Sequence, residues 1–329
     1  MRSVLPYVWY PLYFALAIAM FALMLEGGAP LLAALYLPIA LVAVSIVVLE
    51  LLDPERRDWR PGWRDVRADA AFMILVQVVL PRVLLPLTVL GVAELNHDPT
   101  QGPWPHHLPL AAQAILMVLS VDLLRYWLHR ACHGFPVLWR LHEVHHSPDI
   151  LYSLNVGRFH PLEKVLHFSL DSVPFVVLGA GPEVIAAYFL LYAVNGFFQH
   201  SNVRLRYGFL NYLVGSAQTH RWHHARDPKT AACNFGNTTI IWDLLFGTWY
   251  LPKNRNLNIG IPDRDYPKDF WSQMFTPFRS KPGSRPGPRA LVADLAIAML
   301  LRWTRGMAGR NIARAARDPV RKQEALLFD

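Results

Sequence analysis

Residues 4–25 read VLPYVWYPLYFALAIAMFALML, and after a short break residues 31–48 read LLAALYLPIALVAVSIVV. Each stretch is long enough to cross a hydrocarbon core of about 30 Å as an α-helix. The first stretch lacks the small-residue cleavage site of a signal peptide. We therefore predict that both are retained transmembrane helices.

Two more apolar runs follow, at residues 70–93 and 108–128. The first of them contains Pro81, Arg82 and Pro86. Proline interrupts the helical hydrogen bonds, so we expect a kinked helix whose arginine faces other helices or reaches toward the membrane surface. The pattern predicts a third and a fourth span.

A longer apolar stretch, residues 165–198, is broken near its middle by Gly179-Ala180-Gly181-Pro182. Such a break predicts a helical hairpin that enters and leaves the membrane from one side. Hydrophobic residues make up 53% of the 329 residues and charged residues 17%, with a mean hydropathy of +0.22. This is more apolar surface than an ordinary soluble domain can bury, so we expect an all-α integral membrane helical bundle.

The formal net charge of +8 does not indicate a nucleic-acid partner, because the basic residues flank apolar runs and no nucleic-acid motif is present. Residues 26–28 and 96–107 contain no Lys or Arg. The segment after the second run, by contrast, carries five arginines: Arg56, Arg57, Arg60, Arg64 and Arg67. By the positive-inside rule, the N-terminus and this segment lie in the cytoplasm. We expect the membrane to be a bacterial inner membrane.

The two cysteines, Cys132 and Cys233, form no framework of disulfides. Cys132 lies within a histidine-rich segment that the topology places in a reducing cytosol. We predict that both are free thiols.

Histidine is distributed unevenly along the chain. Of fourteen histidines, eight fall in three short motifs, and His200 stands alone at the predicted cytoplasmic end of a helix. Following the chain through four spans brings all of these to the cytoplasmic side. The motifs are HxxxH (His129, His133) and two copies of HxxHH (His142, His145, His146 and His220, His223, His224).

Histidines at i, i+3 and i+4 of a helix share one face, and so many imidazoles at one membrane face need a common partner. Metal coordination satisfies their nitrogens without accumulating charge. A single zinc takes three or four protein ligands, so eight or nine histidines imply two metal ions. All-imidazole sites suit Fe, Zn, Cu or Ni, and the ligand type alone does not choose among them.

Other readings of the histidines remain open. His142-Glu143-Val144-His145-His146 also fits HExxH, the motif of zinc metalloproteases in which the glutamate is the base. That reading leaves His145 idle, and the second copy has Arg221 where a protease needs glutamate. A bis-histidine haem carrier would use only two ligands per haem, and a metal transporter should place ionisable residues along a path through the membrane.

The three motifs resemble those of the fatty acid hydroxylase / sterol desaturase superfamily. Accompanying segments also match: Asp122 with 126–130 (YWLHR), 158–163 (RFHPLE), 234–236 (NFG) and 242–248 (WDLLFGT). The resemblance covers roughly residues 110–250. It implies an integral membrane oxidoreductase that uses two iron ions, O2 and externally supplied electrons to hydroxylate or desaturate a lipid such as a sterol or fatty acyl chain.

Carried over position by position, the resemblance implies eight metal ligands, with His200 as a ninth. These are His129, His133, His142, His145, His146, His220, His223 and His224. The chain shows no GxGxxG, flavin or iron–sulfur motif, so no organic cofactor is expected and electrons come from a separate reductase, ferredoxin or cytochrome.

Four further residues are candidates to support the ligands. Asp122 lies seven positions before His129 and could orient its ring, or it could be a buried partner of Arg125 or Arg130. His160 could reach a metal, hydrogen-bond a ligand or line the lipid pocket. The last candidates, Asp227 and Asn234, follow the third motif and could support its histidines. The predicted outer loop holds His97, His106 and His107, and His167 is expected in a membrane segment away from the motifs.

These expectations divide the chain into three parts. Residues 1–107 form the N-terminal transmembrane helices, residues 108–252 the hydroxylase-like catalytic domain, and residues 253–329 a cytosolic tail. Within the tail, the apolar stretch 290–301 precedes several arginines, which predicts an amphipathic helix on the membrane surface or a helix packed on the cytosolic domain.

Overall fold

The structure, a computed structural model, describes residues 4–94, 102–253 and 257–279. Every regular element within these ranges is helical, and they contain isolated β-bridges but no strand. Four helices are long and apolar enough to cross a membrane. The expected all-α fold with membrane-spanning helices is confirmed.

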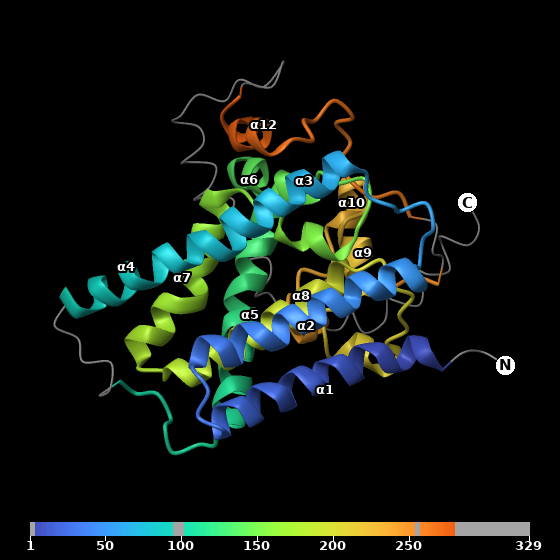
Figure 1. Cartoon of the computed structure of the whole chain (residues 1–329). Coiled ribbons are helices and arrows are strands. Elements are labelled where there is room, and N and C mark those ends of the chain that lie inside the picture. The colour runs from blue at the N-terminus through green and yellow to red at the C-terminus, as the bar shows by residue number, and fades with distance from the viewer. Residues whose placement is uncertain (1–3, 95–101, 254–256, 280–329) are drawn as a thin grey trace. The chain divides into compact units, whose positions relative to one another are not determined.

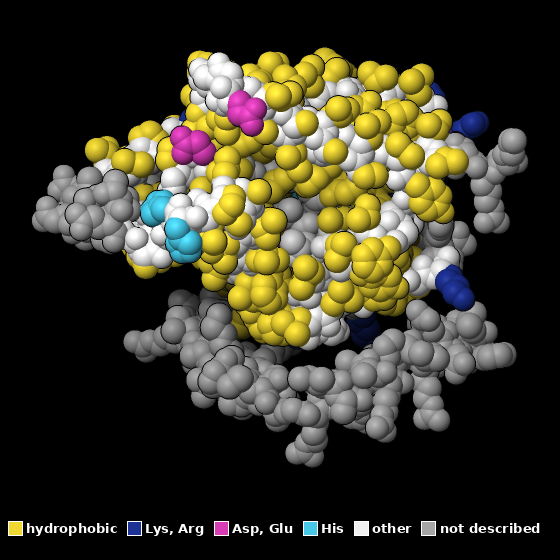
Figure 2. Space-filling view, turned by 90° about the horizontal axis from the view of Figure 1, so that it is seen from below, with side chains coloured by type: hydrophobic (Ala, Val, Ile, Leu, Met, Phe, Trp, Pro, Cys, Tyr) yellow, Lys and Arg dark blue, Asp and Glu magenta, His cyan; other side chains and the backbone are white. Residues whose placement is uncertain are grey.

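The first two helices, α1 (Leu5–Glu26) and α2 (Leu31–Leu52), form an antiparallel hairpin (Figure 1). One side of the hairpin packs on α8 (Pro182–His200), where Tyr10 donates a hydrogen bond to Asn195 Oδ1 at 2.8 Å. The opposite side leaves large apolar residues such as Leu23 and Leu51 exposed. Figure 2 shows one face of the molecule covered largely by hydrophobic side chains, as expected of a surface that meets lipid.

The third span is a composite rod made of α3 (Trp63–Phe72), the π-helix η1 (Met73–Val79) and α4 (Leu80–Glu94). The wider π turns stand directly before Pro81, whose missing N–H interrupts the regular helical bonding. Arg82 lies over the Tyr36 ring of α2 at 4.8 Å, so it faces another helix, as the sequence predicts.

The fourth span, α5 (Leu110–Gly134), is longer than its apolar run and includes the first histidine motif in its last turns. After one residue the chain reverses into α6 (Pro136–His146), which ends on the second motif. The predicted hairpin forms α7 (Pro161–Leu178) and α8, and Gly179 between them has the left-handed φ of 88° that ends α7.

Short helices and loops fill the end of the bundle where α5, α6 and α8 finish. They include the third histidine motif on α9. The elements are η3 (Ser153–Gly157), η4 (Gly208–Tyr212), α9 (Ala217–His223), α10 (Pro228–Ala231), α11 (Ile241–Phe246), α12 (Phe270–Phe275) and η5 (Thr276–Phe278).

The arginine-rich segment lies at this same end. The backbone N–H of Arg56 donates to Asn202 Oδ1 at 2.9 Å, and the Asn202 amide donates to the Arg56 carbonyl at 2.8 Å. Because Asn202 follows the last residue of α8, the segment packs close to His200. We predicted that the arginines and the histidine motifs lie on the same side of the membrane. In the structure they lie at the same end of the helical bundle.

Among the described residues, those from 4 to 251 and from 257 to 277 form one compact unit, which holds all the helices through α12. The predicted tail helix at 290–301, as well as His97, lies outside the described residues.

Candidate metal centre

All nine histidines predicted as ligands lie at the end of the bundle where α5, α6 and α8 finish, and they form two neighbouring groups. Within each group, one ring nitrogen from every member lies within 4.8 Å of those of the others. The five-His group comprises His129, His133, His142, His146 and His223, and the four-His group comprises His145, His200, His220 and His224.

The two HxxHH motifs contribute to both groups in a crossed manner. On α6, the first and last histidines of the motif enter the five-His group and the middle one enters the four-His group. On α9 the assignment is reversed. Rings at i and i+4 lie on one helical face, about 40° apart, and the ring at i+3 points about 60° from the first and about 100° from the second, so each short helix serves two adjacent sites.

In the five-His group, two ring nitrogens that face each other both lack a proton, so they cannot form a hydrogen bond. His129 Nδ1–H donates to the Phe235 carbonyl at 2.8 Å, which leaves a lone pair on Nε2. His142 Nδ1–H donates to Glu163 Oε1 at 2.6 Å, which leaves a lone pair on its Nε2 as well. Yet these two Nε2 atoms are 3.0 Å apart. Two lone pairs at this distance repel unless a cation binds both.

The four-His group has the same character. His200 Nδ1–H donates to Asn155 Oδ1 at 2.9 Å, and its Nε2 lies 3.0 Å from His220 Nε2. His224 Nε2 is 3.1 Å from the same His220 atom. Two imidazoles bound at about 2.1 Å to one metal at a right angle place their nitrogens about 3.0 Å apart, so both groups fit a metal ion.

Burial keeps these rings in the form that binds metal. It lowers the pKa of all six motif histidines on α6 and α9, and neighbouring histidines lower it further. A neutral imidazole has a free lone pair at neutral pH, whereas an imidazolium has none. The groups can therefore bind metal ions without first losing protons.

Glu163 supports the five-His group; it ends the matching segment 158–163 (RFHPLE) but was not among the predicted site residues. Both its carboxylate and the His142 ring that it accepts from are buried, with 0% and 1% of the side chain exposed. A carboxylate behind a ligand histidine fixes the ring orientation and makes the ring a stronger donor to a metal. The corresponding partners in the four-His group are neutral, namely the Arg158 carbonyl for His145 and the Asn155 amide for His200.

The segment 233–235 holds two ligand rings through its backbone. The Cys233 carbonyl accepts from His223 Nδ1 at 2.8 Å, and the Phe235 carbonyl accepts from His129. Asn234, between them, has a left-handed φ of 51° and donates to the carbonyls of Thr219 and Tyr250. Asn234 therefore shapes the loop that carries these two carbonyls.

The other three supporting candidates contact different partners. Asp122 accepts from the backbone N–H of Thr239, and Arg125, one of its proposed partners, pairs instead with Asp171. His160 caps α7, because its Nδ1 accepts from the backbone N–H of Leu162 at 3.2 Å. Asp227 is exposed and caps α10.

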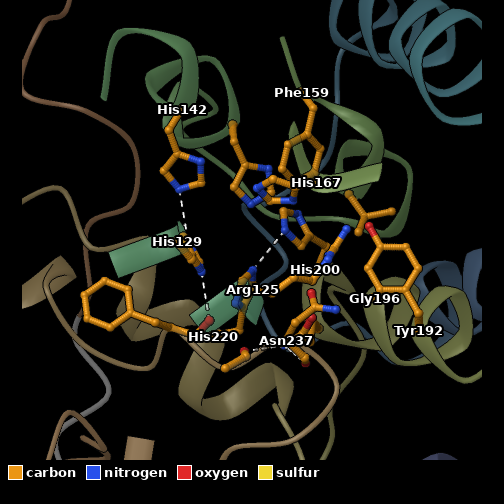
Figure 3. A pocket seen from close by; sticks show the side chains of 15 residues that line it. Arg125, His129, His142, Phe159, His167, Tyr192, Gly196, His200, His220 and Asn237 are labelled. Atoms are coloured by element: carbon orange, nitrogen blue, oxygen red, sulfur yellow. Dashed lines mark hydrogen bonds between the residues drawn. The ribbon is translucent and has the colours of Figure 1, made fainter. Parts of the chain in front are cut away.

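A pocket opens beside the two groups (Figure 3). Members of both groups line it, and a buried ion pair of Arg125 with Asp171, bonded at 2.6 and 2.8 Å, lies at its wall. The lining consists of His129, His142, His145, His200 and His220 together with Arg125, Val156, Phe159, His167, Tyr192, Gly196, Gln199, Phe235, Gly236 and Asn237. Contrary to expectation, His167 is part of this lining, since α7 turns its ring toward α6.

Cys132 and Cys233 are free thiols, as predicted, and both are buried. Burial raises the pKa of the Cys233 thiol above its ordinary value, which keeps this group protonated and unreactive. Cys132 lies near His142 and Glu163 and is grouped with them as a possible metal-binding trio. Because His142 already belongs to the five-His group, this trio does not form a separate site.

Fold and site together define a helical protein with candidate membrane spans and two adjacent groups of histidines that could hold metal ions. Comparison with known proteins agrees: residues 114–248 match the fatty acid hydroxylase family. The predicted resemblance to the fatty acid hydroxylase / sterol desaturase superfamily is confirmed for this part of the chain. No solved structure matches it.

Several named relatives are similar in sequence. Ornithine lipid hydroxylase OlsE of Rhizobium tropici is 29% identical over 289 residues, which cover 86% of each chain. Alkylglycerol monooxygenase of Danio rerio is 29% identical over 160 residues, 49% of this chain and 35% of that protein. Very-long-chain aldehyde decarbonylase GL1-8 of Oryza sativa subsp. indica is 29% identical over 182 residues, 53% of this chain and 67% of that protein. At the level of enzyme class, the predicted O2-dependent oxidoreductase is confirmed.

Proposed function

We propose that the protein is a membrane-bound, non-haem di-iron oxygenase that hydroxylates a lipid. The observation that supports this most strongly is the division of nine histidines, seven buried and two half-buried, into two adjacent groups, each with the nitrogen spacing of a metal site. We assign all nine as ligands to two iron ions per chain. Iron suits imidazole ligands and the O2 chemistry of the superfamily.

The substrate is proposed to be a membrane lipid, either a sterol, a fatty acyl chain or a polar lipid of the kind named for the relatives. Ornithine lipid is the first to test, because the ornithine lipid hydroxylase aligns over most of both chains. Hydroxylation is the expected outcome and desaturation is the alternative, since both begin with removal of a hydrogen from an unactivated carbon.

The residues of the centre have separable tasks. When bound, the two irons supply the oxidising power for C–H cleavage, using O2 and electrons from a separate reductase, ferredoxin or cytochrome. The histidines hold both ions in a buried site, and Glu163 orients His142. Apolar pocket walls at Val156, Phe159 and Phe235 hold hydrocarbon and exclude water.

We further propose that the chain is a multi-pass protein of a bacterial inner membrane with the metal centre on the cytoplasmic side. The predicted division at residues 107 and 252 is retained as a proposal. Supporting this, the arginine-rich segment lies at the same end as the metal centre, and arginine-rich short loops stay in the cytoplasm.

Cysteine labelling of intact cells tests the sidedness. Asp58→Cys probes the arginine-rich segment, and its side chain is exposed. For the opposite end His106→Cys is suitable, whereas Gly102 is not, because a Cβ there would lie 2.1 Å from the Leu178 carbonyl. A membrane-impermeant maleimide should label position 106 and not position 58. Labelling of position 58 alone would reverse the proposed orientation.

Turnover under ¹⁸O2 tests the reaction. Purified protein with iron, a reductase system and ornithine lipid or a host lipid extract should give a lipid product that contains one labelled oxygen. A new double bond without label would establish a desaturase. The remaining alternative is a zinc metalloprotease or hydrolase that acts through the HExxH match at 142–146. Activity without O2 that incorporates oxygen from water would establish this alternative and overturn the proposed oxygenase function.

A further inference from the structure

His167 occupies a position that the metal centre does not explain. It lies on α7, one turn after Glu163, and its side chain is 6% exposed. Its ring belongs to neither histidine group but lines the pocket beside them (Figure 3). The ring centre is 5.6 Å from that of Phe159, which in turn stacks on His145 at 4.3 Å. One phenyl ring therefore separates His167 from the four-His group.

The hydrogen-bonding capacity of His167 is unused. Neither ring nitrogen has a hydrogen-bond partner, and the nearest carboxylate oxygen, Glu163 Oε1, is 3.6 Å from Nε2, beyond bonding distance. Folded proteins rarely bury a polar group in this way unless a ligand or water completes it. His160, on the same helix, shows the contrast, because both of its nitrogens bond to the protein backbone.

Other polar groups of the pocket are already paired. Arg125 is bonded to both oxygens of Asp171, and the Gln199 amide donates to the Asn237 carbonyl at 2.8 Å. Outside the two histidine groups, His167 is the described lining residue whose polar atoms are buried without a partner. A bare methylene chain in the pocket would leave both nitrogens unpaired, which is unfavourable.

We propose that His167 binds the substrate by a hydrogen bond to an oxygen or nitrogen atom of the lipid that lies a few bonds from the carbon to be hydroxylated. The inference rests on the proposed lipid hydroxylase function and narrows its substrate. The reacting carbon belongs to or adjoins a polar group, such as a headgroup, an ester, an amide or an ether, and not to the middle of a hydrocarbon chain.

Two variants of His167 test the proposal in the holoenzyme. His167→Phe keeps a ring of similar size and removes both nitrogens, whereas His167→Gln retains a donor and an acceptor. With the host lipid extract or ornithine lipid as substrate, we expect the KM of His167→Phe to rise about tenfold, since a site built to hydrogen-bond a substrate depends on that bond. His167→Gln should recover part of the loss. Iron per chain should equal that of the wild type in both.

The position of the new oxygen gives an independent readout. Tandem mass spectrometry of the wild-type ¹⁸O product should place the label a few bonds from an oxygen or nitrogen of the lipid. A mid-chain label overturns the proposal, as does a wild-type KM in His167→Phe. Loss of iron from both variants would make His167 part of the metal centre and also overturn it. If the wild type makes no oxygenated lipid at all, the proposed function itself fails, and this inference fails with it.

Discussion

The five-His and four-His groups are built from copies of one motif but differ in how they are supported. The five-His group takes a second i,i+4 pair from α5, and the carboxyl group of Glu163 stands behind His142. The four-His group takes only His200 beyond the motifs, and its partners are neutral. Two of the five rings line the pocket, against three of the four.

Under the proposed function, this difference makes the two metal sites unlike. The five-His site has more donors and a carboxyl group behind one of them, so it should hold its metal more tightly. The four-His site has fewer donors and borders the pocket more fully, which leaves room for another ligand on the side where the substrate binds. Loss of one histidine should therefore affect the two groups unequally. His145→Ala and His129→Ala test this directly, Glu163→Gln tests the carboxyl group behind His142, and Asp122→Ala tests a residue outside both groups.

The largest effect is expected from His145→Ala, which leaves the four-His group with three donors. The variant should fall from two irons to one per chain, and turnover should drop at least about 100-fold, because a lost ligand changes both affinity and coordination geometry. Iron analysis and product formation measure this. His106→Ala, at an exposed position outside both groups, is the matched control. Two tightly held irons in His145→Ala would refute its role as a ligand.

His129→Ala should also nearly abolish turnover but retain more metal. Four donors would remain in the five-His group, among them the carboxylate-supported His142. As purified, His129→Ala should keep two irons per chain, one of which a chelator removes at a lower concentration than in the wild type, whereas His145→Ala should keep one. Equal or easier loss of iron would contradict the proposed difference between the sites.

Glu163→Gln tests the charge behind the five-His group. The amide preserves shape but replaces a charged acceptor with a neutral one, so the iron affinity of this group should fall about 10–100-fold while the other iron stays bound. Chelator titration should then show one weakened and one unchanged site. Glu163→Asp, which keeps the charge, serves as the control. Equal weakening of both irons would show that Glu163 has a general structural role.

The smallest effect is expected from Asp122→Ala. Asp122 accepts a hydrogen bond from Thr239 and contacts no ligand ring, so both irons should remain. Its removal leaves one backbone N–H unpaired, with an expected loss of stability of about 1–3 kcal/mol. A thermal melt in detergent, with iron analysis alongside, checks this. Loss of iron would place Asp122 closer to the metal centre than its contacts indicate.

Several local features of this chain were predictable from sequence. The spans, the break at Gly179 and the histidine motifs all depend on residues near one another in the chain, because hydropathy and helical periodicity are local properties. The expectation for Arg82 is confirmed for the same reason: a charge within an apolar helix must face another element. The predicted run at 108–128 missed the end of α5, since the helix continues where the apolar pattern stops.

The support of the metal centre was not predictable in this way. His129 and the Phe235 carbonyl are 106 positions apart, and His200 and Asn155 are 45 apart, so no local pattern connects them. Asp122 shares a helical face with His129, but its carboxylate bonds to a distant loop instead of the ring. Glu163 and His167 resemble ordinary helical residues until α7 packs beside the motifs.

By itself, the sequence determined that the protein is a helical membrane protein with enough clustered histidines for two metal ions. Composition and spacing suffice for this, because they state how apolar each segment is and which rings share a helical face. Only the tertiary structure decided which histidines share a site, which of them a carboxylate supports, and that His167 borders the pocket. Those facts depend on how α5, α6, α7, α8 and α9 pack, and packing joins residues that are far apart in the chain.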